Sequence, residues 1–337
     1  METVADLFLK REGEYLSPYA FHTVNTRGRL HPCEKSDCRT EFQRDRDRIL
    51  HSKSFRRLMH KTQVFLAPEE EHYRTRMTHT LEVTQIARII ARALSLNEDL
   101  TEAIALGHDL GHTPFGHAGE KAMAACFSQD FTHYAQSLRV VDCLENDGQG
   151  LNLTYEVRDG ILNHTGEHMA STLEGVVVKF ADRIAYLNHD IDDACRAGIL
   201  SPDDIPRSVR EALGASHSER INTLVSSVIS ASSGKPAIEM GAETEGAFFE
   251  LRAFMYQNVY TNPTAKAEEE KAIALLCRLY EHYLENPAEM PGLYFSAIER
   301  DGKARCVCDF IAGMSDRYAI ETYREIFIPK VWRKPSV

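Results

Sequence analysis

Residues 105–120 have the sequence ALGHDLGHTPFGHAGE, which places three histidines and two carboxylates among glycines and a proline. The adjacent pair His108-Asp109 is unusual in a core segment, because both side chains resist burial without partners. A neutral imidazole beside a carboxylate suits a hard or borderline divalent metal. The glycines and Pro114 end one helix and let the chain turn back over such a site. A polar loop with hydrogen-bonded histidines is the alternative interpretation.

Length and composition indicate an ordinary globular protein. The chain of 337 residues is long enough for one large domain or two modest ones, and its 43% hydrophobic and 26% charged residues are typical of globular chains. No apolar run approaches the roughly 20 residues that a membrane span needs. The first ten residues lack the basic and apolar regions of a secretory signal. We therefore expect a cytoplasmic enzyme that does not bind membranes.

The eight cysteines are scattered along a large chain, which indicates reduced thiols. Cys33 and Cys38 lie near His31, and Cys306 lies near Cys308, so each pair could supply half of a zinc site. A second half with suitable ligand spacing does not stand out for either pair. The sequence therefore favours metal binding at the His-Asp motif over a cysteine zinc site.

The distribution of charge singles out one basic segment. The formal net charge of −11 argues against broad nucleic-acid or membrane binding by the whole surface. Residues 39–76 nevertheless contain ten Lys or Arg against six Asp or Glu, with Asp45 and Asp47 alternating with arginines. A solvated, salt-bridged helix face explains this pattern. A guanidinium-rich wall for phosphates explains it equally well, because arginine matches phosphate oxygens bidentately.

Helical periodicity dominates the chain, and few runs alternate with the period of a strand, so we predict an all-α protein. Residues 1–38 are expected to form an irregular arm, and Asp99 or Thr101 is expected to cap one helix. A mobile loop is predicted at 230–246. Two helices are predicted to begin near residues 40 and 117. The other predicted helices span residues 73–94, 99–110, 156–164, 172–197, 247–259, 265–285 and 315–326. The predicted domains are an N-terminal arm (1–38), a core (39–200) and a C-terminal helical region (201–337) packed on the core.

Four candidate ligands lie on three different predicted helices: His79, the pair His108-Asp109, and Asp182. Nitrogen and oxygen ligands from separate helices, with coordination positions left open, are typical of a catalytic metal. His117 and Glu120 are separated by one helical turn, so the carboxylate is expected to orient the imidazole.

Longer stretches carry a resemblance to a known family. The set His79, His108-Asp109 and Asp182 resembles the metal motif of the HD superfamily. The stretches RDRDRILHS (44–52), FRRL (55–58), KTQVF (61–65), QSLRVV (136–141), ADRIAY (181–186) and AGMSDR (312–317), together with 108–120, resemble bacterial dGTPase-like deoxynucleoside triphosphate triphosphohydrolases. The resemblance covers most of residues 11–330. It implies an HD-domain helical bundle with additional N- and C-terminal helices.

The resemblance also implies an activity and a site. The reaction is hydrolysis of dGTP or a broader set of dNTPs at the α-phosphorus, giving deoxynucleoside and tripolyphosphate. The metal, Mg or Mn with Fe, Co, Ni or Zn as alternatives, would be held by His79, His108, Asp109 and Asp182. The α-phosphate would be surrounded by His112, His117, Glu120 and His133, and the phosphates would be bound by Lys53, Arg57, Arg76 and Arg183. The deoxyribose would be recognised by Gln63, Tyr186 and Asp190.

Within this set we predict that His117, oriented by Glu120, protonates the leaving 5′-oxygen, with His133 as its competitor. His164 is expected to be a core histidine or to support a ligand. The family resemblance further implies a homo-oligomer, such as a dimer, tetramer or hexamer, and leaves room for an activating dNTP and for single-stranded DNA.

Two alternatives remain open on the sequence alone. Another HD phosphohydrolase, acting on nucleoside monophosphates, cyclic nucleotides or guanosine tetraphosphate, would share the metal ligands. The arginine-rich segment 44–57 and Gln63 favour a triphosphate over these substrates. A non-catalytic nucleotide or single-strand DNA binder is compatible with a basic segment in an acidic chain. The complete set of His112, His117, Glu120 and His133 argues against a site that has lost its catalytic activity.

Overall fold

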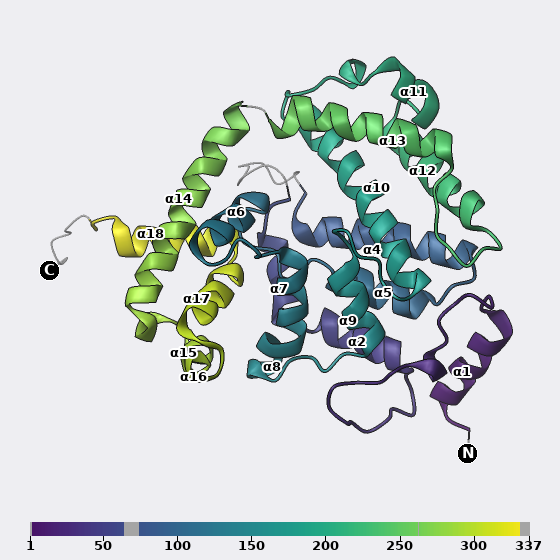
Figure 1. Cartoon of the computed structure of the whole chain (residues 1–337), viewed down its shortest axis with the longest axis horizontal. Coiled ribbons are helices and arrows are strands. Elements are labelled where there is room, and N and C mark those ends of the chain that lie inside the picture. Colours follow the sequence, from purple (N-terminus) through teal and green to yellow (C-terminus); the bar gives the residue numbers. More distant parts are fainter. Residues whose placement is uncertain (1, 64–73, 262, 331–337) are drawn as a thin grey trace, which may run out of the picture.

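The computed structural model describes residues 2–63, 74–261 and 263–330, with side chains left out at 263–267. Helices form nearly all the regular structure of these residues, and no strand occurs among them (Figure 1). Two isolated bridges join Arg29 to Thr154 and Thr62 to Thr75. The prediction of an all-α fold is confirmed. Within the described ranges, no helix combines the length and apolar character required to span a bilayer.

The longer helices of the described residues have nine or more residues each. They are α1 (Val4–Tyr15), α2 (Glu41–Leu50), α4 (Arg76–Ala93), α5 (Glu98–Gly107), α6 (His117–Cys126), α9 (Tyr155–Asn163), α10 (Leu173–Arg196), α12 (His217–Ser232), α13 (Ala242–Met255), α14 (Pro263–Glu285), α17 (Lys303–Ala312) and α18 (Asp316–Phe327). The shorter ones are α3 (Lys53–Arg57), α7 (His133–Arg139), α8 (Glu145–Gly148), α11 (Arg207–Leu213), α15 (Gly292–Ser296) and α16 (Ile298–Asp301). Two π-helical segments, Val140–Leu144 and Tyr256–Tyr260, follow α7 and α13.

Three local predictions were wrong. The N-terminal arm is not irregular, because Thr3 and Asp6 form a capping box that starts α1. The cap of α5 is Asn97, whose side chain accepts a hydrogen bond from the Leu100 amide at 3.2 Å. The loop predicted at 230–246 is shorter, since α12 continues to residue 232 and α13 starts at 242. The predicted start of α4 at residue 73 lies outside the described residues.

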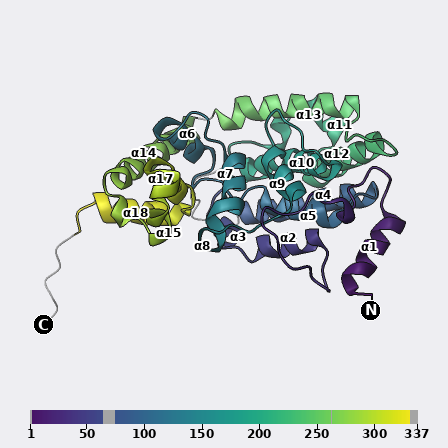
Figure 2. The same ribbon diagram turned by 60° about the horizontal axis from the view of Figure 1, so that its bottom comes forward.

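Two hydrophobic cores organise the helices. The first core contains fully buried residues of α2, α4, α5, α9 and α10 and also of α11–α13, which continue it beyond residue 200. The second core joins α6 to α14, α17 and α18. Figures 1 and 2 both place α14, α17 and α18 together at one end of the molecule, away from α1. The helix α6, from the predicted core, therefore packs with C-terminal helices, while α11–α13 pack on the first core.

Buried polar contacts tie the two cores together. The Asp316 carboxylate accepts hydrogen bonds from the Thr62 amide (2.9 Å), the Thr62 hydroxyl (2.7 Å) and the Phe115 amide (2.9 Å). The buried Lys61 ammonium donates to the Ala312 carbonyl oxygen at 2.8 Å. The start of α18 therefore fixes the loops at 61–63 and 112–116, which carry site residues.

The thiol prediction was wrong for one pair of cysteines. Cys126, at the end of α6, and Cys277, on α14, form a disulfide with a Cα–Cα distance of 6.0 Å. The packing of α6 along α14 brings together two cysteines that are 151 residues apart in the sequence. Cys33 and Cys38 are exposed free cysteines. Over the described ranges, no potential metal-binding group includes a cysteine.

The arginine-rich segment is largely a structural network. The buried Asp45 carboxylate pairs with Arg29 and accepts hydrogen bonds from the Thr154 amide (2.8 Å) and hydroxyl (2.7 Å). Arg48 donates to the carbonyl oxygens of Leu151 (2.8 Å) and Asn152 (2.6 Å). These contacts fasten α2 to the segment before α9, which supports the salt-bridged interpretation of this segment over a wall for phosphates.

This network predicts that two neighbouring carboxylates, Asp45 and Asp47, contribute very differently to the free energy of unfolding. Asp45→Ala should lower the free energy of unfolding by about 3 kcal/mol, because it leaves the buried Arg29 guanidinium short of its partner. Asp47→Ala, which removes a partly exposed ion pair on the same helix, should cost about 1 kcal/mol or less. Urea denaturation of both variants measures these costs. Equal losses for the two variants would contradict this account of Asp45.

Candidate metal and phosphate site

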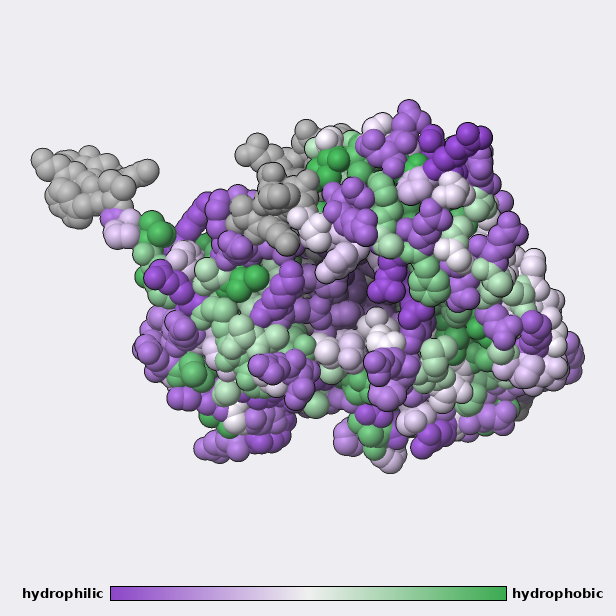
Figure 3. All heavy atoms as spheres, turned by 45° about the horizontal axis from the view of Figure 1, so that its top comes forward, coloured by the Kyte–Doolittle hydropathy of each residue, from purple (hydrophilic) through white to green (hydrophobic). Residues whose placement is uncertain are grey.

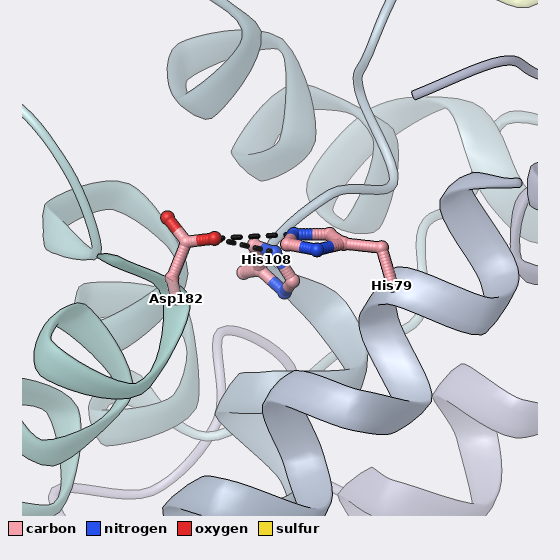
Figure 4. A group of neighbouring side chains, drawn as sticks. All are labelled: His79, His108 and Asp182. Atoms are coloured by element: carbon pink, nitrogen blue, oxygen red, sulfur yellow. Dashed lines mark hydrogen bonds and ion pairs between the residues drawn. The ribbon is translucent and has the colours of Figure 1, made fainter. Parts of the chain in front are cut away.

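Three side chains from three helical segments converge on one point. The ligand atoms of His79 on α4, His108 after α5 and Asp182 on α10 all lie within 4.8 Å of one another (Figure 4). The Asp182 Oδ1 atom lies 3.1 Å from His79 Nε2 and 3.9 Å from His108 Nε2. Burial alone would raise the pKa of Asp182, but the hydrogen bond from His79 and the nearby His108 lower it below its ordinary value. Asp182 is therefore a carboxylate at neutral pH.

The fold presents His108 in the form that a metal ligand needs. Its Nδ1 atom lies 2.6 Å from the Ala105 carbonyl oxygen, which can only accept, so Nδ1 carries the proton. Its Nε2 lone pair is then free, and this buried atom has no hydrogen-bond partner among the described residues. Ser137 holds the turn from both sides: its hydroxyl donates to the His108 carbonyl (2.7 Å) and accepts from the Gly111 amide (2.8 Å). An orphaned, oriented imidazole nitrogen beside a carboxylate fits a divalent ion.

A second donor group adjoins the first and consists of Asp109, His112 and His133. Asp109 Oδ1 lies 3.6 Å from His108 Nε2 and 3.8 Å from His112 Nε2, so this carboxylate stands between the two groups. The Arg76 guanidinium contacts its other oxygen at 3.1 Å. Burial raises the pKa of Asp109, but Arg76 and the surrounding imidazoles lower it well below its usual range. Asp109 is thus positioned to bind a metal ion together with His79, His108 and Asp182.

Glu120 on α6 holds two histidines at once. Its Oε2 lies 3.0 Å from His117 Nδ1, and its Oε1 accepts from the His133 amide and lies 2.8 Å from His133 Nδ1. Burial raises the pKa of Glu120, but these two imidazoles lower it far below its ordinary value. The second nitrogen of His133, Nε2, lies 3.3 Å from His164 Nε2. Both ring nitrogens of His133 are therefore engaged by protein atoms.

His117 differs from these buried histidines. Its side chain is 74% exposed, and its Nε2 atom has no hydrogen-bond partner among the described residues. Its ring centroid lies 5.9 Å from that of His112, which in turn stacks on His133 at 4.3 Å. Burial, together with the neighbouring Arg76 and His133, lowers the pKa of His112 well below its ordinary value, so His112 is neutral. His117 alone of these three presents a free nitrogen to solvent.

Several predicted substrate residues border this cluster. Arg76 also donates to the carbonyl oxygens of Thr62 (3.3 Å) and Gln63 (3.4 Å). The buried Oε1 atom of Gln63 has no hydrogen-bond partner among the described residues. Arg183, one residue after Asp182 on α10, is half-buried and makes no hydrogen bond or ion pair within the described part of the chain. These unpaired polar groups fit a polar ligand better than a closed core.

The far end of α10 adds a second polar cluster. Asp190 is buried, and its Oδ2 atom accepts a hydrogen bond from the Tyr260 hydroxyl. Burial raises the pKa of Asp190 to about 7. The Tyr186 side chain lies one turn before Asp190, and burial raises the pKa of its phenol as well. Sequence analysis missed Tyr260, because no local spacing connects residue 260 to α10.

The structure separates Lys53 and Arg57 from the other predicted substrate residues. The Lys53 ammonium pairs with Asp147 at 3.1 Å, and Arg57 donates to Ser54 at 2.7 Å and lies 3.7 Å from Glu145. Both line a pocket beside the 145–147 turn, whose lining includes none of the candidate metal ligands. Carboxylates far away in the sequence determine this placement in the ligand-free protein, and the assignment of these two residues to the phosphates stays a prediction.

Comparisons with known proteins agree with this geometry. An HD domain matches residues 76–187, and a phosphohydrolase-associated domain matches residues 238–325. The deoxyguanosinetriphosphate triphosphohydrolase-like protein of Caldanaerobacter subterraneus subsp. tengcongensis is 54% identical, over 99% of this chain and 98% of its own length. The protein of the same name from Desulfatibacillum aliphaticivorans is 49% identical, over 97% of this chain and 99% of its own.

The chain belongs to this family of deoxyguanosinetriphosphate triphosphohydrolase-like proteins. The resemblance predicted from the sequence is confirmed, and the chain is an HD-domain phosphohydrolase. A solved phosphohydrolase from Bacteroides thetaiotaomicron shares the fold, with a TM-score of 0.54 and 20% identity over 83% of this chain and 67% of that one. All four predicted metal ligands lie inside the HD match.

The geometry predicts which residues hold a metal. His108→Ala and Asp182→Asn should each reduce bound Mn²⁺ from about one equivalent or more to under a tenth, because each removes a ligand from the converging group. Elemental analysis after dialysis measures the content. The double variant Cys33→Ser/Cys38→Ser is the control and should keep full content. Retention of metal by Asp182→Asn, or its loss from the cysteine variant, would refute the assignment.

Proposed function

We propose that this protein hydrolyses deoxynucleoside triphosphates, dGTP or a broader set, to deoxynucleoside and tripolyphosphate in a metal-dependent reaction. The observation that carries the proposal is the position of Asp109. Its carboxylate lies between the group of His79, His108 and Asp182 and the histidines near Glu120. One compact cluster thus combines metal ligands, an arginine and an oriented proton donor. The names of the relatives support a deoxynucleotide as the substrate.

The residues present fit a divalent ion. A bound ion would act as a Lewis acid on the phosphoryl group that reacts. Two imidazoles with two carboxylates suit Mn²⁺, Fe²⁺, Co²⁺, Ni²⁺ or Zn²⁺, whereas Mg²⁺ prefers an all-oxygen shell. We therefore expect Mn²⁺ to support a higher rate than Mg²⁺. Arg76 and Arg183 would offset the negative charge of the phosphates. During the reaction this charge grows on the leaving and bridging oxygens.

The leaving 5′-oxygen of the nucleoside needs a proton. His117 is suited to supply it, because Glu120 holds its Nδ1 atom while Nε2 faces solvent without a partner among the described residues. His133 is less suited, since Glu120 and His164 occupy both of its nitrogens. We assign proton donation to His117 and a supporting position beside Glu120 to His133.

The direct experiment is incubation with each dNTP and each rNTP in Mn²⁺ or Mg²⁺, followed by chromatography of the nucleosides and of the released anion. We expect deoxynucleoside and tripolyphosphate from dNTPs and at least tenfold less product from rNTPs. Release of orthophosphate or pyrophosphate would indicate another HD phosphohydrolase and refute the proposal. Tight dNTP binding without turnover in any metal would indicate a nucleotide sensor instead.

The proton-donor assignment predicts a distinct kinetic pattern. His117→Ala should lower kcat by about 10²–10⁴-fold with bound metal unchanged, because it removes general acid catalysis and no metal ligand. Glu120→Gln should lower kcat less, by about tenfold, because the imidazole stays in place without its carboxylate. Steady-state kinetics with metal analysis measures both. Near-normal turnover by His117→Ala, together with a large loss in His133→Ala, would transfer the role to His133.

A further inference from the structure

The helix α13 carries apolar side chains on both of its faces. Its inward face packs on the first core through Ala247, Phe248, Leu251 and Met255. Its outward face, with the first residue after the helix, exposes apolar residues at alternating spacings of four and three: Ala242, Gly246, Phe249, Ala253 and Tyr256. A surface helix normally presents polar residues to solvent, and a helix that is apolar all round is normally covered. The outward face of α13 has no such cover within the described part of the chain.

Two large side chains dominate this outward face. Phe249 is 50% exposed and Tyr256 is 64% exposed. Figure 2 shows α13 along the outer edge of the molecule. Figure 3, in which the top of Figure 1 comes forward, shows hydrophobic residues among hydrophilic ones over the upper part of the surface, where α13 lies. Alternating spacings of four and three are the pattern by which two helices pack along each other. The outward face is therefore suited to a second helix.

Charged residues border these apolar residues on one flank. Glu245 and Arg252 are both exposed, and neither side chain makes a hydrogen bond or ion pair with another described residue. They are seven residues apart, which places them on the same flank of the helix but about 10 Å apart along it. The two charges are thus too far apart to pair within one helix, and both remain available to a partner.

An antiparallel pair of α13 helices satisfies both features. It brings Phe249 of each copy against Gly246 of the other, where a Cβ atom would meet only open space and the ring has room. In the same register Glu245 of each copy lies beside Arg252 of the other, so two ion pairs form around one two-fold axis. A parallel pair would instead set Phe249 against Phe249 and Glu245 near Glu250, which carries the same charge.

The opposite flank limits the strength of this pairing. It sets Glu243 near Glu250 of the second copy, and like charges repel, although Glu250 is held to its own chain by the Ser208 hydroxyl at 2.6 Å. One pair of 14-residue helices also buries less surface than the about 1,600 Å² of a standard interface. We therefore expect dissociation constants in the micromolar range. The glutamates around the face disfavour nucleic acid or an anionic membrane as its cover.

We infer that α13 is the two-fold contact of a homodimer, in which it packs antiparallel against α13 of a second copy. The complementarity of the face with itself, in both size and charge, identifies the second copy as the partner. The inference does not rest on the proposed function, because the contact includes no residue of the candidate site and needs neither nucleotide nor metal.

The first test compares Phe249→Glu with the wild-type protein by sedimentation velocity across the micromolar range, without nucleotide. We expect wild type to form dimers, or larger assemblies with an even number of subunits. Phe249→Glu should raise the dissociation constant at least about 100-fold, because it places a charge at the centre of the contact in both copies. Monomeric wild type, or association that Phe249→Glu leaves unchanged, would overturn the inference.

The matched control is Phe295→Glu on α15. Phe295 is 47% exposed, close to the value for Phe249, and Figures 1 and 2 both place α15 away from α13. This variant should associate as wild type does. Loss of association in Phe295→Glu, with association retained in Phe249→Glu, would move the contact to another face and refute the role of α13.

Charge reversal tests the antiparallel register with variants that keep the apolar face intact. Glu245→Arg and Arg252→Glu should each raise the dissociation constant at least about tenfold, since each replaces two ion pairs by two repulsive contacts. The double variant Glu245→Arg/Arg252→Glu restores opposite charges and should return to within about threefold of wild type. Continued weak association of the double variant would refute the inference. Tighter association of Glu245→Arg alone would also refute it, because that result indicates a parallel pair with Glu250 as the neighbour.

Discussion

The buried ion pair between Arg76 and Asp109 is the contact on which the site depends. A carboxylate in a helical core is tolerated only with partners, and Asp109 has a guanidinium on one oxygen and imidazoles on the other. Arg76 starts α4 and Asp109 follows α5, so this pair fixes the register between the two helices. The same contact therefore contributes to the packing of α4 on α5 and to a preorganised set of ligands.

Close backbone approach is the second requirement of the 105–120 segment. A Cβ atom at Gly111 would collide with the Ser137 backbone, and one at Gly119 would collide with the Pro114 carbonyl oxygen. The first glycine lets α7 approach the His-Asp turn closely enough for Ser137 to bind it. The second lets α6 fold back over the turn. The glycines thus do more than end a helix and let the chain turn, as the sequence pattern indicated: they also permit these close backbone contacts.

Sequence reasoning worked where the chemistry is local and failed where partners are distant. The His-Asp pair, the one-turn spacing of His117 and Glu120, and the carboxylate on α10 that meets His79 all follow from helical periodicity and residue type. Lys53 and Arg57 were also assigned to the phosphates. In the structure both pair with acidic side chains of the 145–147 turn, which no local spacing predicts. The Tyr260–Asp190 contact and the Cys126–Cys277 disulfide depend on helix packing across 70 and 151 residues. No local pattern carries that information.

The candidate site is assembled from residues of both cores. His79, His108 and Asp182 are attached to helices of the first core, whereas His117 and Glu120 belong to α6, which packs in the second. The contacts of Lys61 and Asp316 cross between the cores and hold the loop that leads from His112 to α6. A change confined to that junction would displace the proposed proton donor without removing a candidate ligand. Under the proposed function, metal binding and proton donation would therefore be separable, because different packing units hold the residues assigned to each.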